Sequence, residues 1–276
     1  MVKVKVAIAT FKNPEQAVIR AVKLIGGIAD LDQRGKQVII KLGIFDPSRL
    51  PYTDVRVARA AASLFHSTRD VSFAESDNPL RTGMQALRQL GYEQAIRFGL
   101  VDLSGNLTKT KRPRLRLLKE QMFSKILLEA NVLVNLPVMK GEPKTGQMSI
   151  GVKNLFGLIP ERTKPRFHGC LDEVLVELLK IFKPALTIVD ATTPCVGSYP
   201  DYKQVNLGLV VAGRDVVAVD TVCAKIMGIN PQSIRHLSLA SEAGIGTVDL
   251  DEIEVVGMHL GEAEEAFRSA LNARSK

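Results

Sequence analysis

The sequence has no tryptophan, only three cysteines and no long uninterrupted hydrophobic run. The cysteines are odd in number and far apart, which argues against a disulfide framework and favours a reducing compartment. The most apolar stretch, residues 126–136, is interrupted by Glu129, Asn131 and Asn135 and is well short of a membrane span. No apolar segment follows the first residues as a signal peptide would require. We therefore expect a cytoplasmic protein without a membrane partner.

The composition is that of an ordinary globular protein, with more basic than acidic residues. Hydrophobic residues make up 46% of the chain and charged residues 24%, and the formal net charge is +8. A positive charge favours anionic partners, which include nucleic acid, an acidic lipid surface and a metabolite that carries phosphate or carboxylate. Composition does not choose among them.

Short β-rich runs alternate with segments of helical period along the whole chain. This alternation predicts an α/β fold with a mostly parallel sheet and helices on both faces, in a single domain over residues 1–276. The one candidate subdomain boundary is a loop rich in Gly, Pro and Lys at residues 139–151. The predicted strands are residues 3–10, 37–42, 71–74, 131–136, 186–190, 206–212 and 253–256, and the predicted helices are residues 14–25, 55–64, 81–90, 171–182, 216–227 and 262–273.

Charged residues stand at or just beyond the ends of four predicted strands. They are Lys41, Glu75, Lys140 and Asp190. Because ligands of open parallel sheets gather outside the carboxyl ends of the strands, we expect these side chains to share one cleft. The alternative is that strand ends are polar and solvated in any protein of this class.

Asp220 interrupts an apolar helical face that also contains Val216, Cys223 and Met227. A buried carboxylate must protonate or find a cation or hydrogen-bond donors. Lys41 and Lys153 are the candidate partners, and a catalytic role for Asp220 is one interpretation. A structural ion pair or a cap to a neighbouring loop is the other.

Further candidates follow the basic loop that begins at Lys140. Lys153 and Asn154 lie among apolar neighbours and could bind an anion, although the loop lacks the glycine-lysine pair of a P-loop. His168 is the histidine best suited to acid–base work. Because no Cys-x-x-Cys is present, zinc and iron–sulfur sites are disfavoured.

A divalent ion such as Mg²⁺ remains a candidate cofactor, because it needs only one or two carboxylates plus oxygens of the substrate. Glu75, Asp190 and Asp220 are the residues that could supply those carboxylates.

Residues 109–119 contain six basic residues. Aromatic residues do not interleave with them, as they do in single-stranded nucleic-acid sites. We therefore interpret the run as a solvated strand edge protected by charge, and nucleic acid as a disfavoured partner.

The Lys-Asn-Leu-Phe-Gly segment at residues 153–157 resembles the central signature of the family called domain of unknown function 362. The resemblance spans nearly the entire chain, but this chain has Lys-Leu-Gly and Lys-Gly-Glu where the family usually has Lys-Pro-Asn and often Lys-Thr-His. Many members also carry a ferredoxin-like module rich in cysteine, which is absent here. The matching features are residues 131–140, residues 153–157, His168, residues 188–190, Gly197 and residues 214–220.

Our first functional hypothesis is therefore an enzyme or binding protein for a small anionic metabolite. In it Lys41, Lys140 and Lys153 hold the anion, and Asp220 or His168 moves a proton. The alternatives are a redox or iron–sulfur accessory protein, which requires the three cysteines to be close together, and a basic nucleic-acid-binding protein. The sequence is compatible with a homo-oligomer and does not name the reaction.

Overall fold

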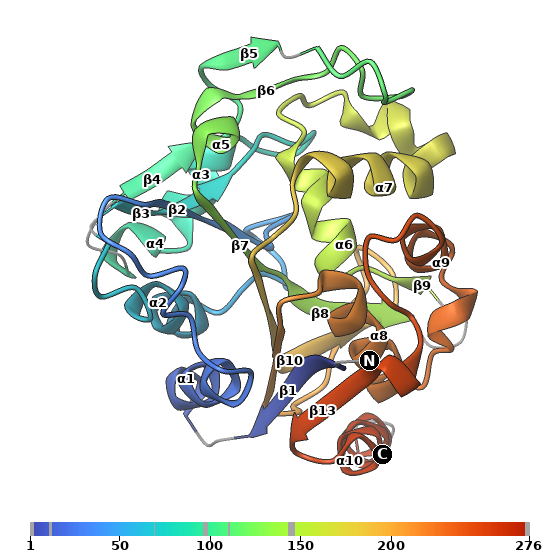
Figure 1. Ribbon diagram of the computed structural model, residues 1–276. Coiled ribbons are helices and arrows are strands. Elements are labelled where there is room, and N and C mark those ends of the chain that lie inside the picture. Colours follow the sequence, from blue (N-terminus) through green and yellow to red (C-terminus); the bar gives the residue numbers. More distant parts are fainter. Residues whose placement is uncertain are drawn as a thin grey trace.

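The computed structural model describes residues 3–10, 13–68, 70–95, 99–109, 111–142 and 147–273. Its central sheet (Figure 1) has the strand order β13-β1-β12-β10-β7-β2-β3-β4. Every neighbouring pair in this order is parallel except the two that involve β12. These strands are β1 (Val4–Thr10), β2 (Gln37–Leu42), β3 (Asp70–Glu75), β4 (Gly99–Asp102), β7 (Val132–Leu136), β10 (Leu186–Val196), β12 (Leu209–Gly213) and β13 (Ile253–Gly257).

Helices cover both faces of this sheet, as the sequence predicts. Successive residues of a strand point to opposite faces, and along β2 Ile39 joins one buried core whereas Val38 and Ile40 join the other. The second core is closed by α1 (Pro14–Leu24), α2 (Val55–Ser63), α3 (Gly83–Gln89) and α4 (Tyr92–Ala95). The first is closed by α5 (Lys125–Glu129), α6 (Gly151–Asn154), α7 (Leu171–Ile181), α8 (Val216–Ile226), α9 (Arg235–Glu242) and α10 (Leu260–Asn272).

Local sequence signals fix where several helices begin. The Asn13 side chain accepts a hydrogen bond from the Glu15 amide at 2.8 Å, and Pro14 occupies the first helical position of α1. The Asp54 carboxylate caps α2 in the same manner. None of the helices in the described ranges is long and apolar enough to cross a bilayer.

Two segments differ from the prediction. The stretch predicted as a loop at residues 139–151 contains β8 (Val138–Glu142) and β9 (Gln147–Met148), which pair with each other, and β8 also pairs with β10. Residues 143–146 lie outside the described ranges. Strand β10 continues to Val196 because both β8 and β11 (Lys203–Gln204) pair with its second half. The sheet therefore extends past the edge where the sequence predicts the site.

The basic run is mostly not a strand. Only its start belongs to β5 (Leu107–Lys109), which pairs with β6 (Met122–Ser124) in a separate two-stranded sheet. The rest of its described part is irregular because the buried Glu177 carboxylate accepts hydrogen bonds from the amides of Arg116, Leu117 and Leu118. The prediction of an exposed edge strand is wrong for these residues.

Candidate functional site

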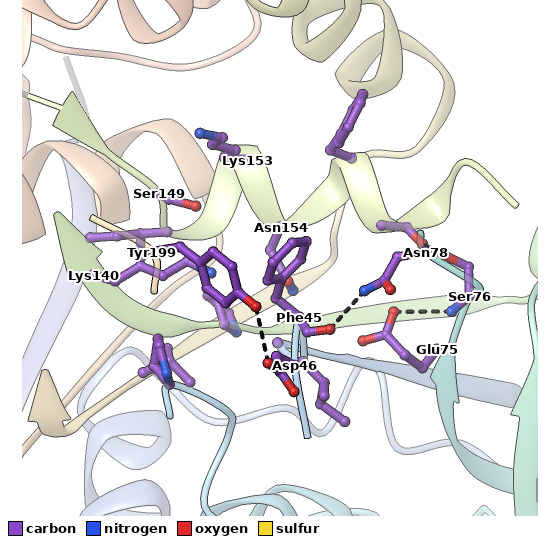
Figure 2. Close-up of a pocket in the computed structure, with 18 of the residues that line it drawn as sticks. Phe45, Asp46, Glu75, Ser76, Asn78, Lys140, Ser149, Lys153, Asn154 and Tyr199 are labelled. Carbon is purple, nitrogen blue, oxygen red and sulfur yellow. Dashed lines mark hydrogen bonds between the residues drawn. The ribbon is translucent and has the colours of Figure 1, made fainter. Parts of the chain in front are cut away.

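A cavity of about 330 Å³ lies where β2, β3 and β7 end (Figure 2). Strand topology brings its walls together, because these three parallel strands deliver their carboxyl ends to one edge of the sheet. The segment from β8 through α6 supplies a further wall. Six of the predicted site residues line this cavity, namely Lys41, Glu75, Lys140, Lys153, Asn154 and His168.

The floor of the cavity is a buried cluster of charged side chains. Lys41, which is 1% exposed, places Nζ 2.9 Å from Glu75 Oε1 and also donates to the Leu42 carbonyl at 2.6 Å. The Arg81 guanidinium lies 3.6 Å from Glu75 Oε2 and donates to the carbonyls of Ser76 and Ile44. Burial lowers the pKa of Lys41, and the Glu75 carboxylate opposes that shift. One carboxylate therefore serves two buried cations.

Lys164, at the start of the 3-10 helix η2 (Lys164–Cys170), adds a third cation to this cluster. Its side chain is buried, and Nζ donates to Ser76 Oγ at 2.8 Å. Ser76 Oγ in turn donates to the Gly157 carbonyl. Burial lowers the pKa of Lys164 to about 7; Glu75 opposes this shift, and Lys41 and Arg81 add to it. The hydrogen-bond partner of Lys164 is thus the neutral hydroxyl of Ser76, whereas the partner of Lys41 is the Glu75 carboxylate.

Lys140 on β8 and Lys153 on α6 are the half-buried lysines of the cavity (Figure 2). Neither ammonium group forms a hydrogen bond or ion pair with any of the described residues. Burial, together with the neighbouring charges of Lys153 and Lys41, lowers the pKa of Lys140 to about 8. Burial also lowers the pKa of Lys153. These two side chains retain donors that a ligand can use.

The rim of the cavity is aromatic. The rings of Phe45 and Tyr199 meet edge to face with their centroids 5.1 Å apart, and the Tyr199 hydroxyl donates to Asp46 Oδ2 at 3.2 Å. Both rings are about two-fifths exposed. The cavity is therefore charged at its buried floor and apolar at its mouth.

The lining is strongly cationic as a whole. Two carboxylates, Asp46 and Glu75, face a larger set of positive side chains. Those six are Lys41, Arg49, Arg81, Lys140, Lys153 and Lys164.

The Lys-Asn-Leu-Phe-Gly segment spans the end of α6 and most of the 3-10 helix η1 (Leu155–Leu158), and three of its residues have distinct contacts. Asn154 Nδ2 donates to Asn135 Oδ1 on β7 at 2.9 Å, which ties the segment to the sheet. The Phe156 ring lies 5.9 Å from the ring of His168. A Cβ at Gly157 would lie 2.7 Å from Lys41 Nζ, so only glycine allows this lysine its position.

Asp220 is fully buried, as predicted, but its partners differ from those expected. Oδ1 accepts from the Gly151 amide at 2.7 Å and Oδ2 from the Val152 amide at 2.8 Å. The prediction that Lys41 or Lys153 compensates this carboxylate is wrong, and Asp220 is not among the residues that line the cavity. Burial raises the pKa of Asp220 to about 7 despite the two amide bonds. Asp220 thus caps the start of α6, and it positions the segment that carries Lys153.

Asp190 also lies outside the main cavity. It lines a second cavity of about 420 Å³, where Oδ1 accepts from the amide and hydroxyl of Thr192 and Oδ2 from the Asp54 amide. Burial raises its pKa. In contrast to the prediction of one shared cleft, Asp190 serves to join β10 to the start of α2.

The predicted metal ligands are dispersed. Glu75 is in the main cavity, Asp190 in the second one and Asp220 in the core. Within the described ranges, no group of three or more His, Cys, Asp or Glu side chains is placed to hold a metal ion, and the three cysteines do not form such a group.

Sequence reasoning missed two of the buried cations, Arg81 and Lys164. Arg81 follows a turn in which the Asn78 side chain accepts from the Leu80 and Arg81 amides, and it was assigned to the start of a helix. Lys164 begins a 3-10 helix, which has no hydrophobic period to reveal a buried side. The Asn-Pro turn after β3 was the one signal that could have suggested an inward-pointing residue.

Comparison with known proteins gives a family and one named relative. Thylakoid-associated protein sll1697 of Synechocystis sp. is 27% identical over 235 residues, which is 80% of this chain and 72% of the relative. A crystal structure of a Thermotoga maritima protein shares 11% identity with a TM-score of 0.40, and the match covers 83% of this chain and 58% of that one. The model of the family described as domain of unknown function (DUF362) matches residues 38–225, a range that includes every residue lining the cavity and all but one residue each of β2 and α8. The chain therefore belongs to the DUF362 family.

Proposed function

We propose that this protein binds a small molecule with a phosphate or carboxylate group in the cavity at the ends of β2, β3 and β7. The observation that carries the proposal is the composition of the lining, in which six lysine and arginine side chains face two carboxylates, so positive charge stays in excess even with Lys164 neutral. Charge-assisted hydrogen bonds from ammonium groups to such anions are the strong ones, especially where water is largely excluded.

The two half-buried lysines are the groups that the ligand would satisfy. Lys140 and Lys153 repel each other, and neither forms an ion pair with any of the described residues, although the more distant charges of Glu75 and Asp172 act on them. A bound anion would relieve that repulsion and supply acceptors to both ammonium groups. The Asn154 amide group and the Arg81 guanidinium, both in the lining, are held in place by other protein groups. The cavity is thus organised in advance of binding.

The cavity suits a metabolite better than a polymer. A volume of about 330 Å³ is at the lower end of the range for small-molecule pockets. The charge of the lining is also concentrated in one recess, whereas nucleic-acid sites spread positive charge along a surface.

The test is calorimetric titration of the purified protein with inorganic phosphate, pyrophosphate and citrate at low salt. We expect saturable binding of at least one of these anions, and a loss of about tenfold in affinity for Lys140→Gln, which corresponds to about 1.4 kcal/mol. Lys180→Gln is the matched control, because Lys180 is exposed near the end of α7 and does not line the cavity.

Affinity that is equal in the two variants would overturn the proposal, as would the absence of binding by all three anions to the parent protein. Urea denaturation of both variants checks that their stabilities are comparable.

A further inference from the structure

We propose that Lys164 is a nucleophile, which attacks the carbonyl carbon of an anionic oxo compound and forms an imine with it. The inference rests on the proposed function, because the other lysines of the cavity would hold the anionic group. It adds a covalent step and narrows the ligand to molecules that carry a carbonyl group, such as oxo acids.

The charge balance of the buried cluster identifies the amine. Three cations, Lys41, Arg81 and Lys164, surround the single carboxylate of Glu75. Three buried positive charges with one buried counterion are strongly disfavoured, so one group gives up its proton. Arginine does not deprotonate in proteins, which leaves the two lysines.

The contacts of Lys41 and Lys164 indicate which of the two amines is neutral. Lys41 forms the direct ion pair at 2.9 Å, and this contact with Glu75 favours its protonated form. Lys164 contacts the hydroxyl of Ser76, and a neutral amine can make that contact as well as an ammonium can. The other carboxylate near Lys164, Asp77, is already 3.3 Å from Arg162. Lys164 is therefore the group that is most easily neutral.

The lowered pKa of about 7 agrees with this assignment. An ordinary lysine with a pKa near 10.4 is neutral in roughly one molecule in a thousand at pH 7.5, whereas an amine with a pKa of about 7 is mostly neutral. Nucleophilic lysines are activated in this way, by burial and by neighbouring cations.

The step is balanced as follows. The nitrogen lone pair of Lys164 adds to the carbonyl carbon, and a proton passes from the nitrogen to the former carbonyl oxygen. Water then leaves as the carbon–nitrogen double bond forms, and no oxidant or reductant is required. Ser76 Oγ, 2.8 Å from Nζ, is the group placed to pass the proton.

The experiment traps the imine. The full chain is incubated with glyoxylate, the smallest oxo acid, reduced with sodium borohydride and mapped by peptide mass spectrometry. We expect one dominant adduct on Lys164, and protection by an excess of an anion that binds to the cavity. Lys164→Arg should lose that adduct, whereas the control Lys180→Arg should retain it.

A pH series gives a second readout. Trapping at Lys164 should rise to half of its maximum near pH 7, because burial lowers the pKa of this amine to about 7; the charged groups that face it are Glu75, Asp77, Lys41 and Arg81. An ordinary exposed lysine, with a pKa near 10.4, should still gain reactivity at pH 9. A dominant adduct on Lys140, labelling spread over surface lysines, or a Lys164 profile like that of an ordinary exposed lysine would each overturn the assignment.

Calorimetry with phosphate separates the two proposals. If the anion binds but Lys164 is not labelled, the imine proposal fails alone. If no anion binds, the proposed function fails with it.

Discussion

The protein holds two buried carboxylates that look alike in exposure and differ in what surrounds them. Asp220 faces two backbone amides and an apolar core, and both of its oxygens have a donor. Glu75 faces two cations, and its Oε2 has no hydrogen bond within the described ranges although it lies 3.6 Å from Arg81. Asp220 is closed off from the cavity, whereas Glu75 forms part of its floor.

This difference shows why burial of a charge is a weak guide to function. Both side chains are expensive to bury, and both therefore have partners. The two side chains differ in the hydrogen-bond donors and the positive charges that surround them. Around Asp220 the donors match the acceptors, whereas around Glu75 positive charge is in excess and faces a cavity. Three predictions test this comparison, from the largest expected effect to the smallest.

The largest effect is expected for Glu75→Gln. This change leaves Lys41 and Arg81 buried without a carboxylate, and we expect the free energy of unfolding to fall by about 3–5 kcal/mol. The measurement is urea denaturation. Added phosphate should raise the Tm of this variant by more than it raises the Tm of the parent, because the anion replaces the missing charge.

Glu254→Gln is the control for that change, because Glu254 forms an exposed ion pair with Lys5 at 3.9 Å. Its loss should cost less than about 1 kcal/mol. Equal stability of the two variants would mean that the Glu75 cluster does not hold the charges as described.

The second prediction concerns Asp220 and pH. Its folded-state pKa of about 7 lies above the ordinary value of 3.8, so the folded protein binds more protons between these limits than the unfolded chain does. The contribution of Asp220 to stability is therefore full below about pH 4 and declines as the pH rises to about 7. Asp220→Asn should remove this part of the pH dependence.

The same substitution should also lower stability by about 1–3 kcal/mol at low pH, because the amide group of asparagine cannot accept from both backbone N–H groups. Urea denaturation across pH 4–8 measures both effects. Asp201→Asn, at an exposed position, is the control and should keep the slope of the parent. A slope for Asp220→Asn that equals the parent's would contradict the prediction.

The smallest effects on stability are expected for alanine at two glycines, one beside the Asp220 carboxylate and one beside the Lys41 ammonium group. A Cβ would lie 2.7 Å from Asp220 Oδ1 at Gly151 and 2.7 Å from Lys41 Nζ at Gly157. Overpacking should therefore cost about 1–3 kcal/mol in each alanine variant. Only Gly157→Ala displaces a lysine of the cavity, so phosphate affinity should fall about tenfold more in that variant than in Gly151→Ala.

Gly261→Ala is the control for both variants, because a Cβ there meets nothing within 4 Å. Denaturation and calorimetry on the three proteins give the result. Equal phosphate affinity of the Gly151 and Gly157 variants would show that Lys41 does not take part in binding.

Much of the fold could be predicted because its signals are local. The alternation of short strands with helical periods predicts β2 at Gln37–Leu42 and the whole of α7, with one residue too many at its end. The cap at Asn13 and the proline after it fix the start of α1. Parallel strands then place Lys41 and Glu75 at one edge without further information, and the structure brings them to 2.9 Å.

What could not be predicted depends on contacts between distant segments. Helical periodicity shows that Asp220 is buried, but its partners are amides 68 and 69 positions away, which no local pattern identifies. Lys164 lies 88 positions from Ser76, on a 3-10 helix that lacks an apolar stripe. The second half of β10 was missed because β8 and β11, which pair with it, are short and polar.

The close approach of Gly157 to Lys41 has an evolutionary consequence. Residues 116 positions apart in the chain share one small volume, so a side chain at position 157 requires a shorter residue at position 41. The two positions should therefore diverge together among relatives, and a homologue that has lost this glycine should also have lost the lysine. A side chain gained at position 157 alone would displace Lys41, whereas loss of Lys41 alone would remove the contact that requires glycine.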